Sequence, residues 1–199
     1  MIGFLKEAPT SAAAEQLFAE DVDEHGYVMN VSRLWAYQPE SLTGLFDLAR
    51  ATTAGRFDLR QRAVLVSACA AAAGDSYCSL AWGVRLAATA GEETAAGVLA
   101  GDDSGLTAAE QAMAAWARTV VREPTDTTPA DLEALRAAGF SDDDIFAMTA
   151  FIAVRLAIMT VNDALGVHPD RQLHTGAPPA VRNAITFGRP PSTRESNPA

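Results

Sequence analysis

Residues 58–83 read DLRQRAVLVSACAAAAGDSYCSLAWG, and this stretch decides the fold. Two apolar, alanine-rich runs lie on either side of Gly74, without the alternation of apolar and polar residues that is typical of a half-buried strand. Glycine after an apolar run is a common helix stop, and the aspartate that follows it is a good helix cap. The stretch therefore predicts two long helices, at about 57–74 and 76–91, that fold back on each other as an antiparallel pair.

Helix start and stop signals recur along the rest of the chain. Further helices are expected at 11–26, 39–55, 107–124, 128–139 and 141–166. Each begins at a capping residue or a proline and ends near a glycine or a proline, which is how sequences mark helix ends. No segment alternates for long enough to form a sheet strand. We therefore predict an all-α fold, a helical bundle built around the central pair.

The composition changes near the C-terminus. Residues 176–199 contain five prolines and few large apolar side chains. We predict a single domain over residues 1–175, followed by a proline-rich arm. Within the arm, residues 180–187 are expected to form a short docking helix or to reach a neighbouring subunit, and the last ten residues are expected to be disordered.

The charge balance limits the classes of partner. The chain of 199 residues has 15 basic and 25 acidic side chains and a formal net charge of −10. Such a surface repels phosphate groups, which argues against nucleic acid and anionic membranes as partners. Two cysteines and three scattered histidines provide neither a disulfide framework nor a spaced metal site, so we expect no metal and no cofactor.

The hydropathy pattern predicts a soluble protein. The longest apolar run, residues 148–161, is interrupted by Arg155 and is too short to cross a bilayer. The first fifteen residues contain no apolar run of signal-peptide length. We therefore expect a cytoplasmic location.

Several segments, taken in order, resemble the carboxymuconolactone decarboxylase-like family, which includes the alkyl hydroperoxidase D proteins. The matching segments are residues 58–83 and, around them, LFAED (17–21), GYVMN (26–30), PE (39–40), LEALRAAGFSDDDIFAM (132–148), DALGV (163–167) and TFGRP (186–190). The resemblance implies an AhpD-like helical bundle and a homo-oligomer with its pocket near a subunit interface. It also implies an antioxidant oxidoreductase activity, that of an alkylhydroperoxidase or peroxiredoxin-type thiol peroxidase.

The active-site motif of that family is degenerate in this chain. Catalytic members have a glutamate, then twelve residues later Cys-x-x-Cys, then a histidine four residues after the second cysteine. The spacing places two thiols on one helix face, with the histidine one turn further along to move protons. Here the motif falls on Ala63, Asp75, Cys78 and Trp82, so only the second cysteine is kept. We expect the implied peroxidase activity to be weakened or altered.

Cys78 has two interpretations. A position in the first turn of a helix favours the thiolate through the helix dipole, whereas the carboxylate of Asp75, three residues before it, disfavours a second anion. Cys78 is therefore either a reactive thiol or a buried packing residue. Asp75 is either a helix cap or an acid/base group, and two residues remain open as substitutes for lost groups, Cys69 for the missing cysteine and His25 for the missing histidine.

The candidate pocket residues also have alternative roles. Tyr77 precedes the cysteine, and Trp82 either fills core volume or forms the wall of a ligand pocket. Arg155 is a lone charge within an apolar helix, and a buried guanidinium needs a partner. That partner is either an acid of this chain, such as Asp163, or the carboxylate of a substrate.

Three functional hypotheses remain open, and whether the protein is an enzyme stays undecided at this level. In the first, Cys78 reduces a peroxide, Asp75 is a weak proton partner and an external thiol resolves the product. In the second, a repurposed decarboxylase- or isomerase-type enzyme uses Asp75 and Arg155 on a small-molecule ligand. In the third, the protein is a non-catalytic oligomeric binding or scaffold protein whose pocket is filled by Trp82.

Overall fold

The structure is a computed structural model that describes residues 3–193. In this range the chain forms α-helices, one short 3₁₀ turn at Pro124–Asp126 and no strand, which confirms the all-α prediction. The helices are α1 (Ala12–His25), α2 (Asn30–Trp35), α3 (Pro39–Thr53), α4 (Leu59–Ala73), α5 (Ser76–Ala90), α6 (Glu92–Ala100), α7 (Ala108–Arg122), α8 (Pro129–Ala137), α9 (Asp142–Ala164), α10 (Arg171–Gly176) and α11 (Pro179–Ala184).

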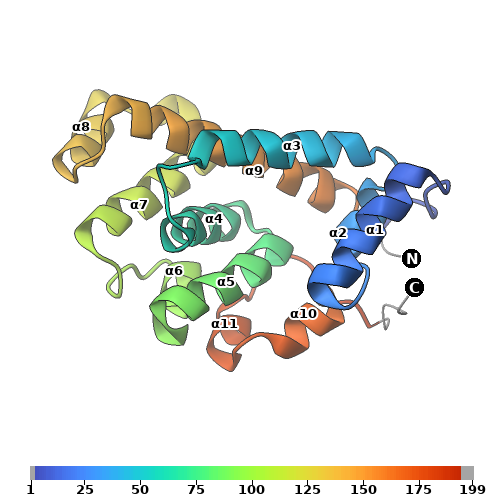
Figure 1. Cartoon of the computed structure of the whole chain (residues 1–199). Coiled ribbons are helices and arrows are strands. Elements are labelled where there is room, and N and C mark those ends of the chain that lie inside the picture. The colour runs from blue at the N-terminus through green and yellow to red at the C-terminus, as the bar shows by residue number, and fades with distance from the viewer. Residues whose placement is uncertain (1–2, 194–199) are drawn as a thin grey trace.

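The predicted pair, α4 and α5, forms the centre of the molecule. Every side chain from residue 63 to residue 70 of α4 is buried, and the helix packs against α5, α6, α7 and α9. Figure 1 shows α4 near the centre of the molecule, with α3 and α9 running together along one side of it. Alanine-rich faces allow this close approach because they add little side-chain bulk. Gly74 ends α4 in the left-handed conformation, with φ of 76°, and Asp75 caps α5.

One interaction ties the start of α4 to the start of α7. Thr107 and Glu110 form a capping box, in which the Glu110 carboxylate accepts a hydrogen bond from the Thr107 backbone N–H at 2.9 Å. The same carboxylate accepts two hydrogen bonds from the Arg60 guanidinium, at 2.5 and 3.0 Å. A charged side chain of the central helix is thus neutralised where it meets a neighbour.

Helix α9 has the length and apolarity of a membrane span, with 23 residues and a mean hydropathy of 1.8 over its most apolar window. In this fold it is a core helix, because it packs against α3, α4 and α7. Those contacts account for its apolar sequence, and a soluble protein with a cytoplasmic location stays a prediction.

Three short helices, α2, α6 and α10, were not expected from the sequence. The C-terminal arm packs on its own chain through α11, which contacts α5 and α6 and completely buries Val181. Of the last ten residues, for which disorder is expected, 190–193 lie against the fold through a hydrogen bond from the Ser192 N–H to the Pro169 carbonyl (2.8 Å). Residues 194–199 lie outside the described part of the chain.

Candidate functional site

A cavity of about 400 Å³ lies beside the first turn of α5 and is lined by side chains from α1, α2, α3, α4, α5 and α9. It therefore joins segments that are far apart in the sequence. Four of the predicted site residues line it, namely Tyr77, Cys78, Trp82 and Arg155. These residues come from two helices, α5 and α9, so the packing of both helices against α4 sets their spacing.

Cys78 lies at the cavity wall with only 4 % of its surface exposed. Its backbone N–H donates to Asp75 Oδ1 at 2.7 Å, and Arg155 Nη2 donates to its Sγ at 3.6 Å. Burial raises the pKa of the Cys78 thiol well above its ordinary value, and the charge of Asp75 adds to this effect. The guanidinium of Arg155 acts in the opposite direction and is the weaker influence, so the thiol is protonated at neutral pH.

Asp75 lies behind the cysteine and is completely buried. Its Oδ2 atom has no hydrogen-bond partner among residues 3–193. Burial, followed by the charge of Asp163, raises the pKa of Asp75 to about 7, although the Cys78 N–H and Arg155 lower it. A carboxyl group with this pKa exists in both protonation states near neutral pH, and can therefore accept the proton of a neighbouring thiol.

Arg155 is 7 % exposed, and its guanidinium carbon lies 5.2 Å from the centroid of the Trp82 ring. The expectation that Asp163 pairs with it was wrong, because no carboxylate in the described range lies within 4 Å of its nitrogens. Eight residues along a helix correspond to a rise of about 12 Å, too far for an ion pair. The Nε atom of Arg155 is buried and has no partner among residues 3–193.

Arg85 is a cavity residue that the sequence analysis missed. Its guanidinium carbon also lies 5.2 Å from the Trp82 ring, and its Nη1 donates to the Ala81 carbonyl at 2.8 Å. Burial lowers the pKa of Arg85, which shows that its charge is held in a partly desolvated place. The signal in the sequence was the spacing of three from Trp82, which places both side chains on one face of α5.

Tyr77 has its hydroxyl group engaged away from the ligand space. It donates a hydrogen bond to Asp170, which is completely buried and also accepts from the Asn30 N–H at 2.8 Å. Burial is the main cause that raises the pKa of both the tyrosine and this aspartate. Tyr77 therefore contributes a fixed wall to the cavity rather than a free hydroxyl group.

Cys69 and His25, the residues considered as substitutes for the missing cysteine and histidine of the motif, lie in different places. Cys69 is completely buried in α4, it is a free thiol like Cys78, and burial raises its pKa to about 12. His25 lines the same cavity, with its Nε2 3.7 Å from the Glu24 carboxylate. His25 therefore shares the ligand space, whereas Cys69 belongs to the core.

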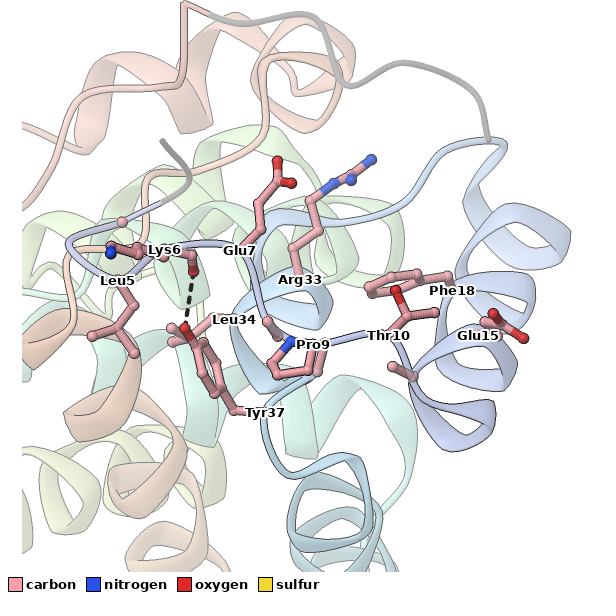
Figure 2. Close-up of a pocket in the computed structure, with 14 residues that line it drawn as sticks. Leu5, Lys6, Glu7, Pro9, Thr10, Glu15, Phe18, Arg33, Leu34 and Tyr37 are labelled. Atoms are coloured by element: carbon pink, nitrogen blue, oxygen red, sulfur yellow. Dashed lines mark hydrogen bonds between the residues drawn. The ribbon is translucent and has the colours of Figure 1, made fainter.

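A second cavity, of about 440 Å³, lies under the N-terminal segment (Figure 2). The Tyr37 hydroxyl donates to the Lys6 carbonyl there at 3.1 Å, and the Arg33 guanidinium carbon lies 5.9 Å from the centre of the Phe18 ring. Its lining includes neither cysteine, and the contact between Tyr37 and Lys6 is exposed to solvent. The Cys78 cavity is thus the better candidate for chemistry.

Comparison of the sequence with protein-family models and with curated proteins gives no match, but the structure matches solved structures along nearly its whole length. An uncharacterized peroxidase-related protein from Ralstonia eutropha JMP134, described as an alkylhydroperoxidase AhpD core, has a TM-score of 0.76 at 23% identity, covering 96% of this chain and 99% of its own. The fold of this chain is AhpD-like. A peroxidase-related protein from Silicibacter sp. TM1040 gives 0.75 at 19% identity, covering 87% and 94%.

A further structural match is the debrominase Bmp8, with a TM-score of 0.70 at 16% identity, covering 93% of this chain and 97% of its own. A Bmp8 variant in complex with 2,3,4-tribromopyrrole gives 0.71. Within the AhpD-like fold, the four positions of the degenerate motif lie on the central pair: Ala63 is buried in α4, and Asp75, Cys78 and Trp82 lie at or after the start of α5.

Proposed function

We propose that the protein is a thiol-dependent enzyme that reduces a small electrophilic molecule at Cys78, with an organic hydroperoxide as the first candidate substrate. One observation carries the proposal: the Arg155 guanidinium donates to the Cys78 sulfur at 3.6 Å in the wall of a ligand-sized cavity. A guanidinium in this position stabilises the negative charge that develops on sulfur as its proton leaves.

In the proposed reaction, the Cys78 sulfur attacks one peroxide oxygen, an S–O bond forms and the O–O bond breaks. The thiol proton passes to Asp75, and the departing alkoxide leaves as the alcohol after it takes up a proton. Cys78 becomes a sulfenic acid. Two external thiols then reduce it, forming one disulfide and one water molecule, because Asp75 replaces the resolving cysteine and Cys69 is locked in the core.

The alternatives have less support from the geometry. A decarboxylase- or isomerase-type enzyme needs Asp75 to face its ligand, but this side chain is completely buried behind Cys78. A non-catalytic protein with a filled pocket needs Trp82 to occupy the cavity, whereas the indole lines it and leaves about 400 Å³. Assembly into a homo-oligomer stays part of the proposal, because it comes from the family resemblance.

A second candidate reaction is reductive dehalogenation of a small aromatic ring. The aromatic wall supports it, since Trp82 and Phe46 line the cavity together with the thiol, and a debrominase shares the fold. In this case two thiols reduce the carbon–halogen bond, giving the hydrogen-substituted ring, a disulfide and hydrogen halide.

The test is consumption of cumene hydroperoxide by the purified protein in the presence of dithiothreitol. We expect turnover that is lost in Cys78→Ser and falls at least about 100-fold in Asp75→Asn, because general-base catalysis contributes about 10²- to 10⁴-fold. Cys69→Ser is the matched control, since it removes the other buried thiol and is expected to keep the activity. Equal activity in the wild type and in Cys78→Ser would contradict the proposal.

A further inference from the structure

The geometry points to a substrate that carries a carboxylate, bound by Arg85 and Arg155 beside Trp82. This inference rests on the proposed function for what happens at Cys78, but the binding step itself does not require the thiol. It narrows the substrate class from any small electrophile to a small apolar or aromatic acid.

The first argument is that no carboxylate within residues 3–193 forms an ion pair with Arg155. Two other partly buried guanidinium groups are paired with acids of this chain: Arg60 pairs with Glu110, and Arg118 pairs with Asp103 through hydrogen bonds of 2.6 and 2.8 Å. Arg155 is more deeply buried than either, yet its single hydrogen bond among residues 3–193 goes to the Cys78 sulfur. Burying a guanidinium without a paired anion is unfavourable, so an anion that enters the cavity gains from pairing with it.

The second argument is that two cations lie together in a protein of net charge −10. Arg85 and Arg155 both line the cavity and both lie against the Trp82 ring. Like charges repel each other: burial is the main cause that lowers the pKa of Arg85, and the charge of Arg155 adds to it, while the charge of Glu24 raises this pKa. A bound carboxylate relieves that repulsion and accepts the paired N–H groups that arginine presents.

Acidic side chains also line the cavity, but they belong to α1 on another wall. Asp21 is engaged, since its carboxylate accepts from the Met29 N–H at 2.8 Å. Glu24 interacts with Arg85 over a longer range and lies 3.7 Å from the His25 ring. Arg50 and Arg62 also line the cavity, but Arg50 pairs with Asp47, and the Arg62 Nε donates to the Asp58 carbonyl at 3.3 Å. Arg85 and Arg155 are the arginines of the lining that lie against Trp82, so a ligand anion beside this ring is bound by them.

The other residues that line the cavity determine the size and polarity of the rest of the ligand. Leu17, Phe46 and Ile158 give the space between the charged walls an apolar surface. A volume of about 400 Å³ accommodates a single ring with short substituents. Because Arg155 contacts both the cavity and the Cys78 sulfur, a carboxylate held there places the adjoining atoms of the ligand beside the thiol.

Isothermal titration calorimetry of the full-length protein with benzoate and with benzyl alcohol tests the inference. The two probes share a ring and differ in charge. We expect benzoate to bind at least about tenfold more tightly than the alcohol, because charge-assisted hydrogen bonds have this effect on affinity. Arg85→Gln is expected to abolish most of the difference. Arg136→Gln, an exposed arginine far from the cavity, removes the same charge and is expected to change nothing.

Equal affinity for both probes in the wild type would overturn the inference without any variant, so a failure of Arg85→Gln to fold does not affect the test. Equal benzoate binding by Arg85→Gln and Arg136→Gln would also overturn it. Benzoate binding that persists in Cys78→Ser, together with no peroxidase activity in the wild type, would refute the proposed function and leave the carboxylate site standing. Peroxidase activity in the wild type, together with equal affinity for benzoate and benzyl alcohol, would support the proposed function and refute the carboxylate site.

Discussion

Asp75 is both the N-cap of α5 and a completely buried carboxyl group. The two conflict, because burial disfavours the charged form of the group that caps the helix. As the N-cap of α5, its Oδ1 satisfies the Cys78 N–H, and the sequence predicts this role because aspartate follows the Gly74 helix stop. Its complete burial could not be predicted, because burial depends on how α5 packs against distant segments. The same limit applies to Arg155: its isolation was visible in the sequence, but its contact with Cys78 depends on the relative rotation of α5 and α9.

The first prediction at this scale concerns Asp75→Asn and stability. The folded-state pKa, about 7, lies above the ordinary value of 3.8, so the folded chain holds this proton more tightly than the unfolded chain. The free energy of unfolding therefore falls as pH rises from 4 to 7, by roughly 4 kcal/mol from about three pKa units. Asparagine caps a helix about as well but carries no charge.

Urea unfolding of both proteins at pH 4 and pH 8 measures this effect. We expect Asp75→Asn to be the more stable protein at pH 8 and the difference to be nearly absent at pH 4. A difference of the same size at both pH values would show that the charge of Asp75 does not limit stability.

The second prediction concerns the ground-state reactivity of Cys78. In Cys69→Ser protein, the alkylation rate with iodoacetamide is expected to rise with a midpoint above the ordinary thiol pKa of about 8.5, because burial disfavours the thiolate. In the proposed reaction, the thiol proton then leaves only as the substrate reacts. A midpoint near or below 7 would show instead that Arg155 outweighs burial.

At the scale of elements, the sequence specifies helices wherever both ends carry a signal. The helices α1, α3, α7, α8 and α9 begin at the predicted caps or prolines and end within two residues of the predicted stops. The short helices α2 and α10 lack side-chain caps, and α6 lies between two glycines, so the tertiary packing rather than the local sequence determines them.

A substitution at Gly83 tests how closely α5 packs against α6 and α11. A Cβ atom added there would lie 2.8 Å from Val181 Cγ1 and 3.0 Å from Leu99 Cδ1, so α5 has no room for a methyl group against α11 and α6. We expect Gly83→Ala to lower the free energy of unfolding by about 1–3 kcal/mol, even though alanine is the better helix former. Gly44→Ala in α3 is the control: its added Cβ has nothing within 4 Å, so it is expected to stabilise by about 0.5–1 kcal/mol. Denaturant unfolding that shows both variants stabilised would contradict the close packing.

At the scale of the whole molecule, the C-terminal arm closes the fold over the start of α5. The Ser76 hydroxyl donates to the Arg189 carbonyl at 2.8 Å, and the Arg189 guanidinium donates to the Asp163 carbonyl at 3.1 Å. The arm thus connects the ends of α5 and α9, the two helices that supply Cys78 and Arg155. The sequence suggested either docking on its own chain or reaching a neighbour, and only a folded surface could distinguish which face the arm meets.

Val181→Asp tests the arm as part of the folded unit. Val181 is completely buried between α11 and the α5–α6 surface, so a carboxylate there is left without a partner, and we expect a loss of at least about 3 kcal/mol. Asn183→Asp adds the same charge on an exposed position of α11 and is expected to have an effect within about 0.5 kcal/mol. If docking of the arm also holds α5 in register with α9, Val181→Asp will raise the alkylation rate of Cys78 under native conditions, whereas Asn183→Asp will not. Unchanged stability and alkylation in Val181→Asp would show that the arm is dispensable and that α5 alone positions the thiol.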